Sequence, residues 1–512
     1  MFQNNLLMGA ASISTVTPGY TVDYSCRFND DDSAYLQFTP TTSSAAQKKF
    51  TLSAWIKMGN LKTTAGTAIG CSDAAGTTHA YLYMATMANN KIGSSASGGA
   101  WSLISNVLLR DPTAWYHQLL VYDSAEIISS ERLKIFLNGE LITSYSTYTL
   151  PSASLESPMN HASQPIAIGR LGAYNGDYFD GYLSQVAQVS ELALPPTDFG
   201  EFDDNGVWRP IDITGLDYTG TNSFLLDFAD SSDLGNDISG NNNDFTSSGL
   251  AANDQVTDTP TNNYPTFASN GGRYYSGSYT DQATVSNGNL DILGGSSSYN
   301  SFDVNFTPLN SGKWYFTWDH DTWYNANNDM GIVNEDCRSG LNGTPSWAYA
   351  VNNGSVLVGL ELATKYNIQS ADFTNIQATI PVTATTSDQT VMAVDIDNLK
   401  LWAGFWDESE DDLYWMTNAG GWSDANVDVP ATGTDETCAI IGDNFTFYGW
   451  CYSTRGGGVG FGSVNGGLLS NITQPSGFNE LNTANLATPT ILDGTAHFQP
   501  TLYTGDGSVR NI

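Results

Sequence analysis

Apolar and polar residues alternate along much of the first 190 residues. In residues 48–59, the apolar side chains Phe50, Leu52, Ala54 and Ile56 occupy every second position, and only Trp55 interrupts the polar positions between them. A period of two over this length predicts a half-buried β-strand. Residues 115–123 and 133–145 have the same character. The second of these segments contains Asn138-Gly139, a pair typical of a two-residue hairpin turn with positive φ at both positions.

The spacing of these segments predicts an all-β chain. Strands separated by short turns indicate an antiparallel sandwich over residues 26–193, and a second strand-rich block predicts another sandwich over residues 300–476. Between them, residues 194–299 are rich in Asn, Ser, Gly, Asp and Thr and are expected to form irregular connecting structure. We expect residues 1–25 to dock on the body of the protein or on a partner, and residues 477–512 to form a tail.

Composition narrows the classes of partner. With 18 Lys and Arg against 53 Asp and Glu, the net charge is −35, so phosphate backbones and anionic membranes are repelled. Nucleic-acid binding is not expected. Membrane insertion is not expected either, since no run of about 18 apolar residues occurs. The five cysteines are scattered, and most of them are predicted to be reduced and buried, as in a protein assembled in a reducing cytoplasm.

The order of several short motifs carries a resemblance. DSAYL (residues 32–36), LSAWIK (52–57), WYH (115–117), KIFLNGE (134–140), IGR (168–170) and YFDGYLSQV (178–186) follow one another as in the laminin G-like, concanavalin A-like sandwich. Residues 198–210, 220–228, 237–245 and 254–264 resemble bacteriophage virion proteins, many of which are described as tail fibres. Residues 311–320 and 390–407 resemble SPRY-type sandwiches, which are binding modules.

This resemblance implies a non-enzymatic protein of the virion surface. It would be a tail fibre or receptor-binding component, homotrimeric, attached to other virion proteins and in contact with bacterial surface glycan. A head decoration, capsid fibre or tail-assembly protein is the first alternative. The second is a polysaccharide depolymerase, because concanavalin A-like folds also include glucanases with paired carboxylates.

Two loops have the side chains that sugars need, namely aromatic faces for stacking and Asn or Asp for hydroxyl groups. The first contains Tyr174, Asn175, Asp177 and Tyr178, and the second contains Trp323, Tyr324, Asn325 and Asn327. The alternative for both is that the aromatic rings close the ends of the sandwiches or pack at a subunit interface.

Calcium is the one cofactor that the sequence leaves open. Asp30, Asp31 and Asp32, together with Asp180, have the oxygen ligands of a hard cation, although a solvated acidic turn explains the first three better. Residues 201–212 have EF-hand-like spacing, but the terminal ligands and Pro210 depart from that pattern. The acidic run 407–412 lies where a hairpin turn is expected, so solvation explains it better than catalysis.

Overall fold

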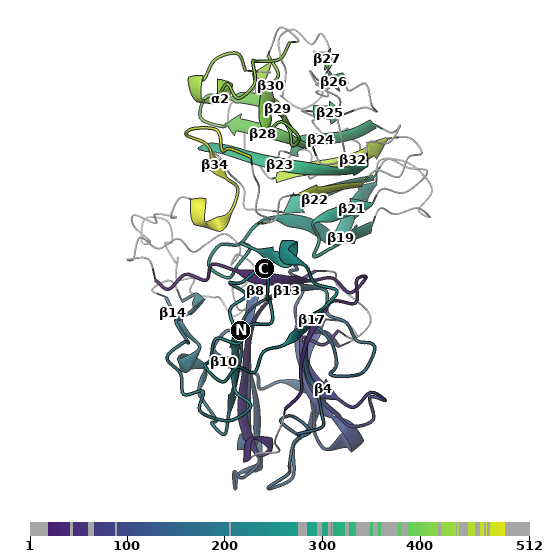
Figure 1. The fold of residues 1–512 in the computed structure, drawn as a ribbon, viewed down its shortest axis with the longest axis vertical. Coiled ribbons are helices and arrows are strands. Elements are labelled where there is room, and N and C mark those ends of the chain that lie inside the picture. The colour runs from purple at the N-terminus through teal and green to yellow at the C-terminus, as the bar shows by residue number, and fades with distance from the viewer. Residues whose placement is uncertain are drawn as a thin grey trace, which may run out of the picture.

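In the computed structural model, the described part of the chain comprises residues 19–40, 45–59, 66–87, 90–203, 206–274, 284–293, 300–305, 309, 311–322, 327–333, 349–351, 357–359, 377–379, 388–417, 421–436, 438–439, 449–455, 461–464, 467 and 472–486. These residues form two β-sandwiches, one above the other in Figure 1. Their helical pieces are short: α2 (Val429–Thr432) and the 3-10 turns η2 (Ala45–Gln47), η3 (Ser97–Gly99), η4 (Ser129–Glu131), η5 (Pro196–Asp198), η6 (Ala252–Asp254) and η7 (Thr483–Asn485). The all-β prediction is confirmed.

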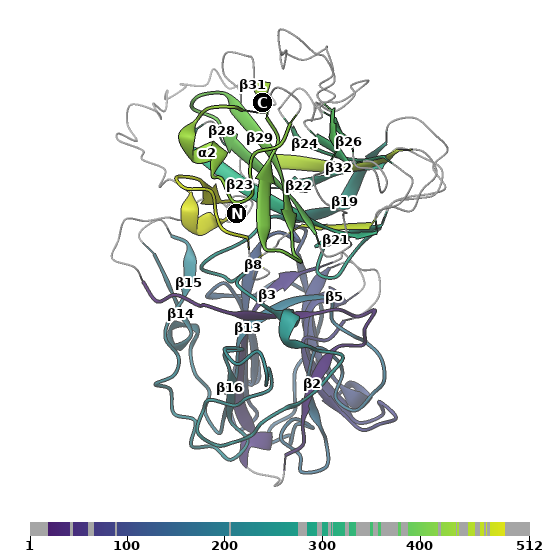
Figure 2. The ribbon, with the colours of Figure 1, turned by 45° about the horizontal axis from the view of Figure 1, so that its top comes forward.

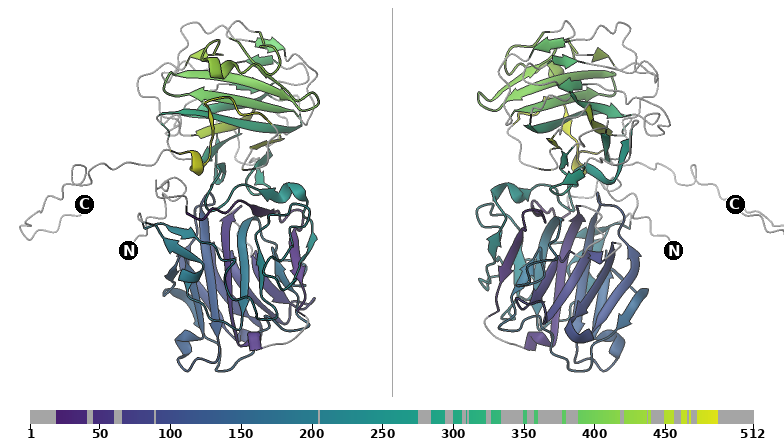
Figure 3. Two further views of the ribbon diagram at one scale, coloured as in Figure 1. Left: turned by 60° about the vertical axis from the view of Figure 1, so that its left-hand side comes forward. Right: turned by 90° about the vertical axis from the view of Figure 1, so that its right-hand side faces the viewer.

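The first sandwich consists of two antiparallel sheets, seen from the side in Figure 3. One sheet contains, in spatial order, β10 (Glu140–Leu141), β9 (Leu133–Leu137), β8 (Trp115–Asp123), β3 (Lys49–Met58), β13 (Gly181–Ser190), β1 (Ser25–Phe28) and β18 (Gln255–Val256), with β16 (Phe224–Leu226) also paired to β13. The other contains β11 (Tyr145–Thr149), β7 (Ser102–Leu108), β6 (Lys91–Ala96), β5 (His79–Met87), β4 (Ile69–Ser72), β12 (Ile166–Ile168), β2 (Tyr35–Phe38) and β17 (Thr246–Ser248).

A continuous hydrophobic core fills the space between these sheets. The alternating apolar residues of β3 all lie in it, and so do apolar residues from every long strand of the facing sheet whose side chains are described. Tyr122 on β8 stacks on Phe50 of β3 with ring centroids 5.0 Å apart, and it contacts Trp101 next to β7 at 5.3 Å. Burial of each such side chain stabilises the fold by roughly 1.5–3 kcal/mol.

The outer face of β3 is buried as well, so the prediction of a half-buried strand was wrong. Every residue of β3 after Lys49 is buried, including the polar ones. The chain that follows β13 folds back over this face and forms a second apolar cluster there, to which Phe199, Ile213 and Tyr218 belong. Trp55 is 3% exposed under this cover, which explains its place among the polar positions.

The connecting segment predicted over residues 194–299 also needs correction. It contains β14 (Gly200–Phe202) and β15 (Trp208–Pro210), which form a hairpin, and β16, β17 and β18, which pair with β13, β2 and β1 of the first sandwich. These strands are only two or three residues long, and β16, β17 and β18 are held by pairing with strands of the first sandwich. The amino-acid composition of residues 194–299 is like that of a linker and does not reveal these short strands.

The second sandwich begins inside the same segment. One sheet contains β19 (Thr266–Tyr274), β22 (Asn300–Asn305), β32 (Gly449–Arg455), β24 (Asn327–Val333), β25 (Tyr349–Val351), β26 (Leu357–Gly359) and β27 (Gln377–Thr379). The other contains β20 (Thr284–Ser286), β21 (Asp291–Leu293), β33 (Phe461–Val464), β23 (Lys313–Thr322), β28 (Gln389–Asp395), β29 (Lys400–Asp407) and β30 (Asp412–Trp415), with β31 (Cys438–Ala439) on β29 and β34 (Asn479–Glu480) parallel to β23. The expected boundaries at residues 300 and 476 thus lie inside this unit. Its likeness to SPRY domains stays a prediction.

Three tryptophans build the core of the second sandwich. Trp402 and Trp406 on β29 and Trp415 on β30 pack in one cluster, and Phe478, the residue immediately before β34, joins it. The Phe478 ring meets Trp402 edge-on, with centroids 5.7 Å apart. Phe478 lies beyond the boundary predicted at residue 476, and this contact packs it against the core of the second sandwich.

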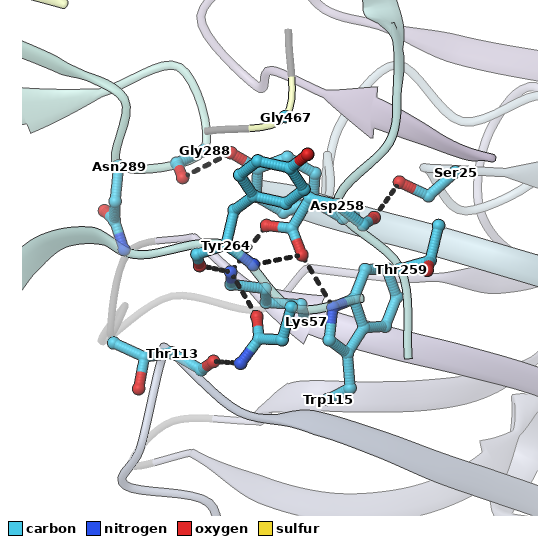
Figure 4. A network of polar contacts seen from close by, with 12 residues as sticks. Ser25, Lys57, Thr113, Trp115, Asp258, Thr259, Tyr264, Gly288, Asn289 and Gly467 are labelled. Atoms are coloured by element: carbon cyan, nitrogen blue, oxygen red, sulfur yellow. Dashed lines mark hydrogen bonds and ion pairs between the residues drawn. The ribbon is translucent and has the colours of Figure 1, made fainter. Parts of the chain in front are cut away.

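A buried polar network lies where the two sandwiches meet (Figure 4). Lys57 and Asp258 are both fully buried and form an ion pair at 2.5 Å. Lys57 Nζ also donates to Asn263 Oδ1 at 2.8 Å and to the Tyr264 carbonyl at 2.7 Å, while Trp115 Nε1 donates to Asp258 Oδ1 at 2.8 Å. Burial lowers the pKa of Lys57 and raises that of Asp258, because each ion has lost its water.

Further hydrogen bonds from this network reach the second sandwich. The hydroxyl of Tyr182 on β13 donates to the Gly288 carbonyl at 2.8 Å, and Asn289 Nδ2 donates to the Gly59 carbonyl at 2.7 Å. On the other side, Tyr264 Oη donates to Glu480 Oε2 at 2.8 Å. Figure 2 shows the turned view, in which β21 belongs to the unit above and β13 to the unit below.

Candidate functional site

The first predicted sugar loop connects β12 to β13 at one end of the first sandwich. Backbone hydrogen bonds hold it in place: Phe179 N donates to the Gly169 carbonyl at 2.8 Å, and Thr67 N donates to the Asp177 carbonyl at 2.8 Å. Tyr174 N donates to Ser72 Oγ at 3.1 Å. The loop is therefore a fixed surface, and its exposed side chains are positioned by the strands that it joins.

Tyr174 is the exposed aromatic residue of this loop. Its side chain is 38% exposed, and the ring rests on two glycines, because a Cβ added at Gly76 or Gly176 would lie 2.9 Å or 2.6 Å from a ring carbon. One part of the ring thus packs on backbone and the rest faces solvent. That is the arrangement of an aromatic stacking platform.

The neighbouring predicted residues lie beside it. Tyr178 Oη donates to Asn175 Oδ1 at 2.6 Å, and the Tyr178 ring lies 6.4 Å from that of Tyr35 on β2. Asp177 is partly buried in the same loop, and this burial raises the pKa of its carboxyl, with a smaller opposing effect from His79. Tyr174, Asn175, Asp177 and Tyr178 therefore lie together in one loop, and sugar binding by this loop stays a prediction.

An arginine that the sequence reasoning overlooked supports this surface. The guanidinium carbon of Arg170 lies 3.4 Å from the centroid of the Tyr35 ring, and Arg170 Nη2 donates to Gln37 Oε1 at 2.7 Å. Arg170 is 8% exposed. Its stacking fixes the Tyr35 ring, next to which Tyr178 lies. The IGR motif at residues 168–170 contains this arginine, but in the sequence it indicates only the type of fold.

The second predicted loop is not tested by the structure. Trp323, Tyr324 and Asn325 lie outside the described residues. Asn327 is the first residue of β24, where its backbone is paired with Arg455 of β32. Its side chain is not described. The prediction for this cluster remains a prediction.

The predicted acidic ligands do not form a metal site in the described structure. Asn29 Nδ2 donates to Asp32 Oδ2 at 2.9 Å, and Asp31 N donates to Asn29 Oδ1 at 3.2 Å, as in a self-contained turn that also includes Asp30. Asp180 is 6% exposed and its carboxylate lies against Gly59. Among the described residues, no group of three or more His, Cys, Asp or Glu side chains could hold a metal ion. Calcium binding stays a prediction without a ligand cluster.

The other acidic segments have structural roles. In the EF-hand-like segment, Asp203 accepts hydrogen bonds from Val207 N at 2.9 Å and from Arg209 Nε at 2.7 Å within the β14–β15 hairpin. In the acidic run, Asp407 and Asp412 are paired across β29 and β30, which makes residues 408–411 the hairpin turn that was expected.

In the described part of the chain, no helix is long and apolar enough to cross a membrane.

Two cavities were not foreseen from the sequence. One, of about 210 Å³, lies beside Trp406 and Trp415 on the second sandwich, and the hydrogen bond from Trp406 Nε1 to Asp411 Oδ1 (3.2 Å) lies at its wall. The other, of about 470 Å³, lies where the sandwiches meet. Its walls come from residues about 260 positions apart in the sequence, from Arg27 to Asp291, so no local motif could reveal it.

Comparison with known proteins matches these observations for the first sandwich. A sequence model described as the Concanavalin A-like lectin/glucanases superfamily matches residues 30–198. The search of curated proteins found no match.

Solved structures with similarity to the chain include three of different kinds. Domain 4 of the extracellular arabinanase AbnA of Geobacillus stearothermophilus, in complex with arabinotriose, is 17% identical over 36% of this chain and 83% of that one, with a TM-score of 0.26. The SPRY domain of human HERC1 is 9% identical over 40% and 99%, with a TM-score of 0.22. Tailspike protein 2 of the Escherichia coli O157:H7 bacteriophage CAB120 is 13% identical over 37% and 28%, with a TM-score of 0.23.

Because the TM-scores are so low, we draw no conclusion about function from these three similarities. The family match and the two facing antiparallel sheets agree with each other and with the order of motifs along the chain. Residues 30–198 therefore form a laminin G-like domain with the concanavalin A-like lectin fold.

Proposed function

We propose that this chain is a bacteriophage virion surface protein, a tail fibre or receptor-binding component that contacts bacterial surface glycan. The motif order of residues 198–264 supports the virion assignment by resemblance. The lectin fold of residues 30–198 supports the choice of ligand. The single observation that carries the proposal is the exposed Tyr174 ring, which is fixed on two glycines beside Asn175 and Tyr178.

Sugar binding at such a surface is shallow. One aromatic face contributes roughly 0.5–1.5 kcal/mol in stacking, and amide and hydroxyl groups around it select the orientation of the sugar. Single sites of this kind bind weakly. A homotrimer, with several trimers on one particle, multiplies the contacts into stable attachment without any deeper pocket.

The net charge of −35 further restricts the ligand. An acidic polysaccharide would be repelled by the protein at low ionic strength, so a neutral glycan fits better. The chain acts in this proposal as a binding protein and carries out no covalent step.

The test compares two exposed tyrosines of the same sandwich. Tyr174→Ala should weaken binding of the purified protein to neutral envelope polysaccharide of the host by about three- to tenfold, since it removes one stacking face. Tyr148→Ala is the matched control, because Tyr148 is 52% exposed on β11, away from the loop. Equal affinity of both variants and the parent would remove the role proposed for Tyr174.

Two further measurements separate the alternatives. Antibody labelling of assembled particles should give signal at the tail, and signal confined to the capsid would favour a head decoration protein. Incubation of the protein with envelope polysaccharide should release no reducing ends. Release of reducing ends would replace the proposal by a depolymerase.

A further inference from the structure

The buried network at the junction contains the three side chains of an amide-forming reaction. Lys57 has an amine, Asn263 has a carboxamide, and the carboxyl group of Asp258 lies beside the amine (Figure 4). In water a lysine is protonated and does not attack a carboxamide. The side chains of Lys57 and Asp258 are 0% exposed, so bulk water does not stabilise either ion here.

Lys57 Nζ lies close to the carboxamide carbon of Asn263. Its hydrogen bond to Oδ1 is 2.8 Å long, and the C=O bond is about 1.23 Å, so Cγ lies at most about 4 Å from Nζ. Reacting atoms approach to roughly 3–3.5 Å before a bond forms, which requires only a small shift of the lysine side chain.

The carboxamide of Asn263 is held in place from two sides. Its Nδ2 donates to the Thr113 carbonyl at 2.8 Å, and its backbone N donates to Thr483 Oγ1 at 2.8 Å. The group that would leave in the reaction, Nδ2, therefore makes its hydrogen bond to Thr113, while Oδ1 is the atom that meets the amine.

Asp258 is positioned to carry the proton. Its Oδ2 lies 2.5 Å from Lys57 Nζ, and Trp115 Nε1 donates to its Oδ1 at 2.8 Å. Burial lowers the pKa of Lys57 and raises that of Asp258, because desolvation disfavours both ions. A proton that passes from the ammonium to the carboxylate leaves a neutral amine, which is the nucleophilic form of lysine.

Aromatic side chains surround the amine. The ring centroid of Tyr182 lies 5.6 Å from Lys57 Nζ, and Tyr182, Trp115 and Tyr264 are all buried. These rings exclude water, which would otherwise solvate the ammonium and compete with the amine as a nucleophile.

We propose that Lys57 and Asn263 become joined by an isopeptide bond, with Asp258 as the proton carrier. Asp258 takes a proton from the Lys57 ammonium, and the free amine attacks Cγ of Asn263. The new bond joins Nζ to Cγ, and the bond between Cγ and Nδ2 breaks. Asp258 delivers a proton to Nδ2 and takes one from the attacking nitrogen. Ammonia is the leaving group, and no atom is oxidised or reduced.

The bond ties the first sandwich to the segment that enters the second. Lys57 is on β3, and Asn263 lies 206 residues later, just before β19. The closed loop contains strands β4 to β18, so the bond restricts the unfolded chain over nearly all of the first sandwich. It is independent of glycan binding and changes no ligand.

The mass of the purified full chain, measured after denaturation, tests the bond. The parent should be lighter than its amino-acid sequence by one molecule of ammonia. Trypsin should not cleave after Lys57 and should give a branched fragment that contains both Lys57 and Asn263. Lys57→Met and Asp258→Ala should retain the ammonia and give no branched fragment. Circular dichroism checks that both variants keep the β-sheet signal of the parent.

Lys49→Met is the matched control. Lys49 is on the same strand, its side chain is 40% exposed, and its Nζ pairs with Asp123 Oδ2 at 2.7 Å. An exposed ion pair of this kind keeps its lysine protonated and unreactive. Lys49→Met should therefore lose ammonia and form the branched fragment like the parent.

The other outcomes would each contradict the proposal. A parent chain with the full mass of its sequence would show that Lys57 stays an ammonium ion, held by Asp258, Asn263 and the Tyr264 carbonyl. Loss of water in place of ammonia would identify Asp258 as the acyl group. Loss of ammonia that persists in Lys57→Met would come from a succinimide at an Asn-Gly pair such as Asn138-Gly139. A branched fragment in Asp258→Ala would remove the role of Asp258.

Discussion

At the scale of single residues, His117 shows how burial fixes a protonation state. Trp208 Nε1 donates to His117 Nδ1 at 3.1 Å, and the other ring nitrogen lies 2.9 Å from Ser53 Oγ. An indole can only donate, so Nδ1 is the acceptor and a neutral ring carries its proton on Nε2, which donates to Ser53. Burial lowers the pKa of His117 to about 3.

This shift predicts a loss of stability in acid. The pKa falls on folding from about 6.5 to about 3, so the stabilisation is complete above about pH 6.5 and declines as the pH falls toward 3. The slope from this group is about 1.4 kcal/mol per pH unit. Urea unfolding at about pH 7 and about pH 5 should therefore show a smaller decline, by about 2 kcal/mol, in His117→Gln than in the parent. Equal declines would contradict the assignment.

At the scale of elements, the hairpin between β9 and β10 shows a turn that was predictable from two residues. Asn138 and Gly139 have φ of 48° and 79°, as the Asn-Gly pair predicts. The structure adds a second constraint, because a Cβ at Gly139 would lie 2.4 Å from a ring carbon of Trp208. The hairpin is therefore packed against β15, which belongs to the cover of the outer face.

Two glycine substitutions separate these constraints. Gly98 has a φ of 66° and an open space around it, so Gly98→Ala should cost about 1–2 kcal/mol for the left-handed conformation alone. Gly139→Ala should cost about 1–3 kcal/mol more, because Trp208 must shift. Free energies of unfolding from denaturant titration measure both. A cost at Gly139 no larger than that at Gly98 would show that the Trp208 contact is loose.

At the scale of the whole molecule, the junction joins the two sandwiches by buried polar contacts. Glu480 on β34 receives the Tyr264 hydroxyl, and burial raises the pKa of this carboxyl. Asn263 N also donates to Thr483 Oγ1 at 2.8 Å. Separating the two units would leave the buried Glu480 carboxylate without its hydrogen-bond donor, which costs free energy. We therefore expect the two units to unfold cooperatively as long as these contacts are intact.

Tyr264→Phe tests this coupling. Loss of the hydroxyl should lower stability by about 1–3 kcal/mol and separate the unfolding of the two sandwiches in scanning calorimetry. Tyr218→Phe is the control, since Tyr218 Oη donates at 3.1 Å to the Ile213 carbonyl inside the first unit. The control should shift the transition without splitting it. Splitting in both variants, or in neither, would remove the special role of the junction.

The features that depend on neighbours along the chain were predictable from the amino-acid sequence. Alternation in β3 predicted the strand and its inner face, Asn138-Gly139 predicted a turn, and residues 174–178, which are neighbours in the sequence, lie in one loop. Hydrogen bonds and side-chain directions over a few residues follow from local periodicity, so these features needed no tertiary information.

Which polar residues are buried, and which groups they contact, depends instead on the packing of distant segments. Lys57 has the position of a solvent-facing residue in its strand, but Asp258, some 200 residues later in the chain, covers it. The strands β16 to β18 and the cavity at Arg27 likewise depend on segments that approach from far along the chain. Local periodicity carries no information about such approaches, because they are selected by the packing of the whole fold.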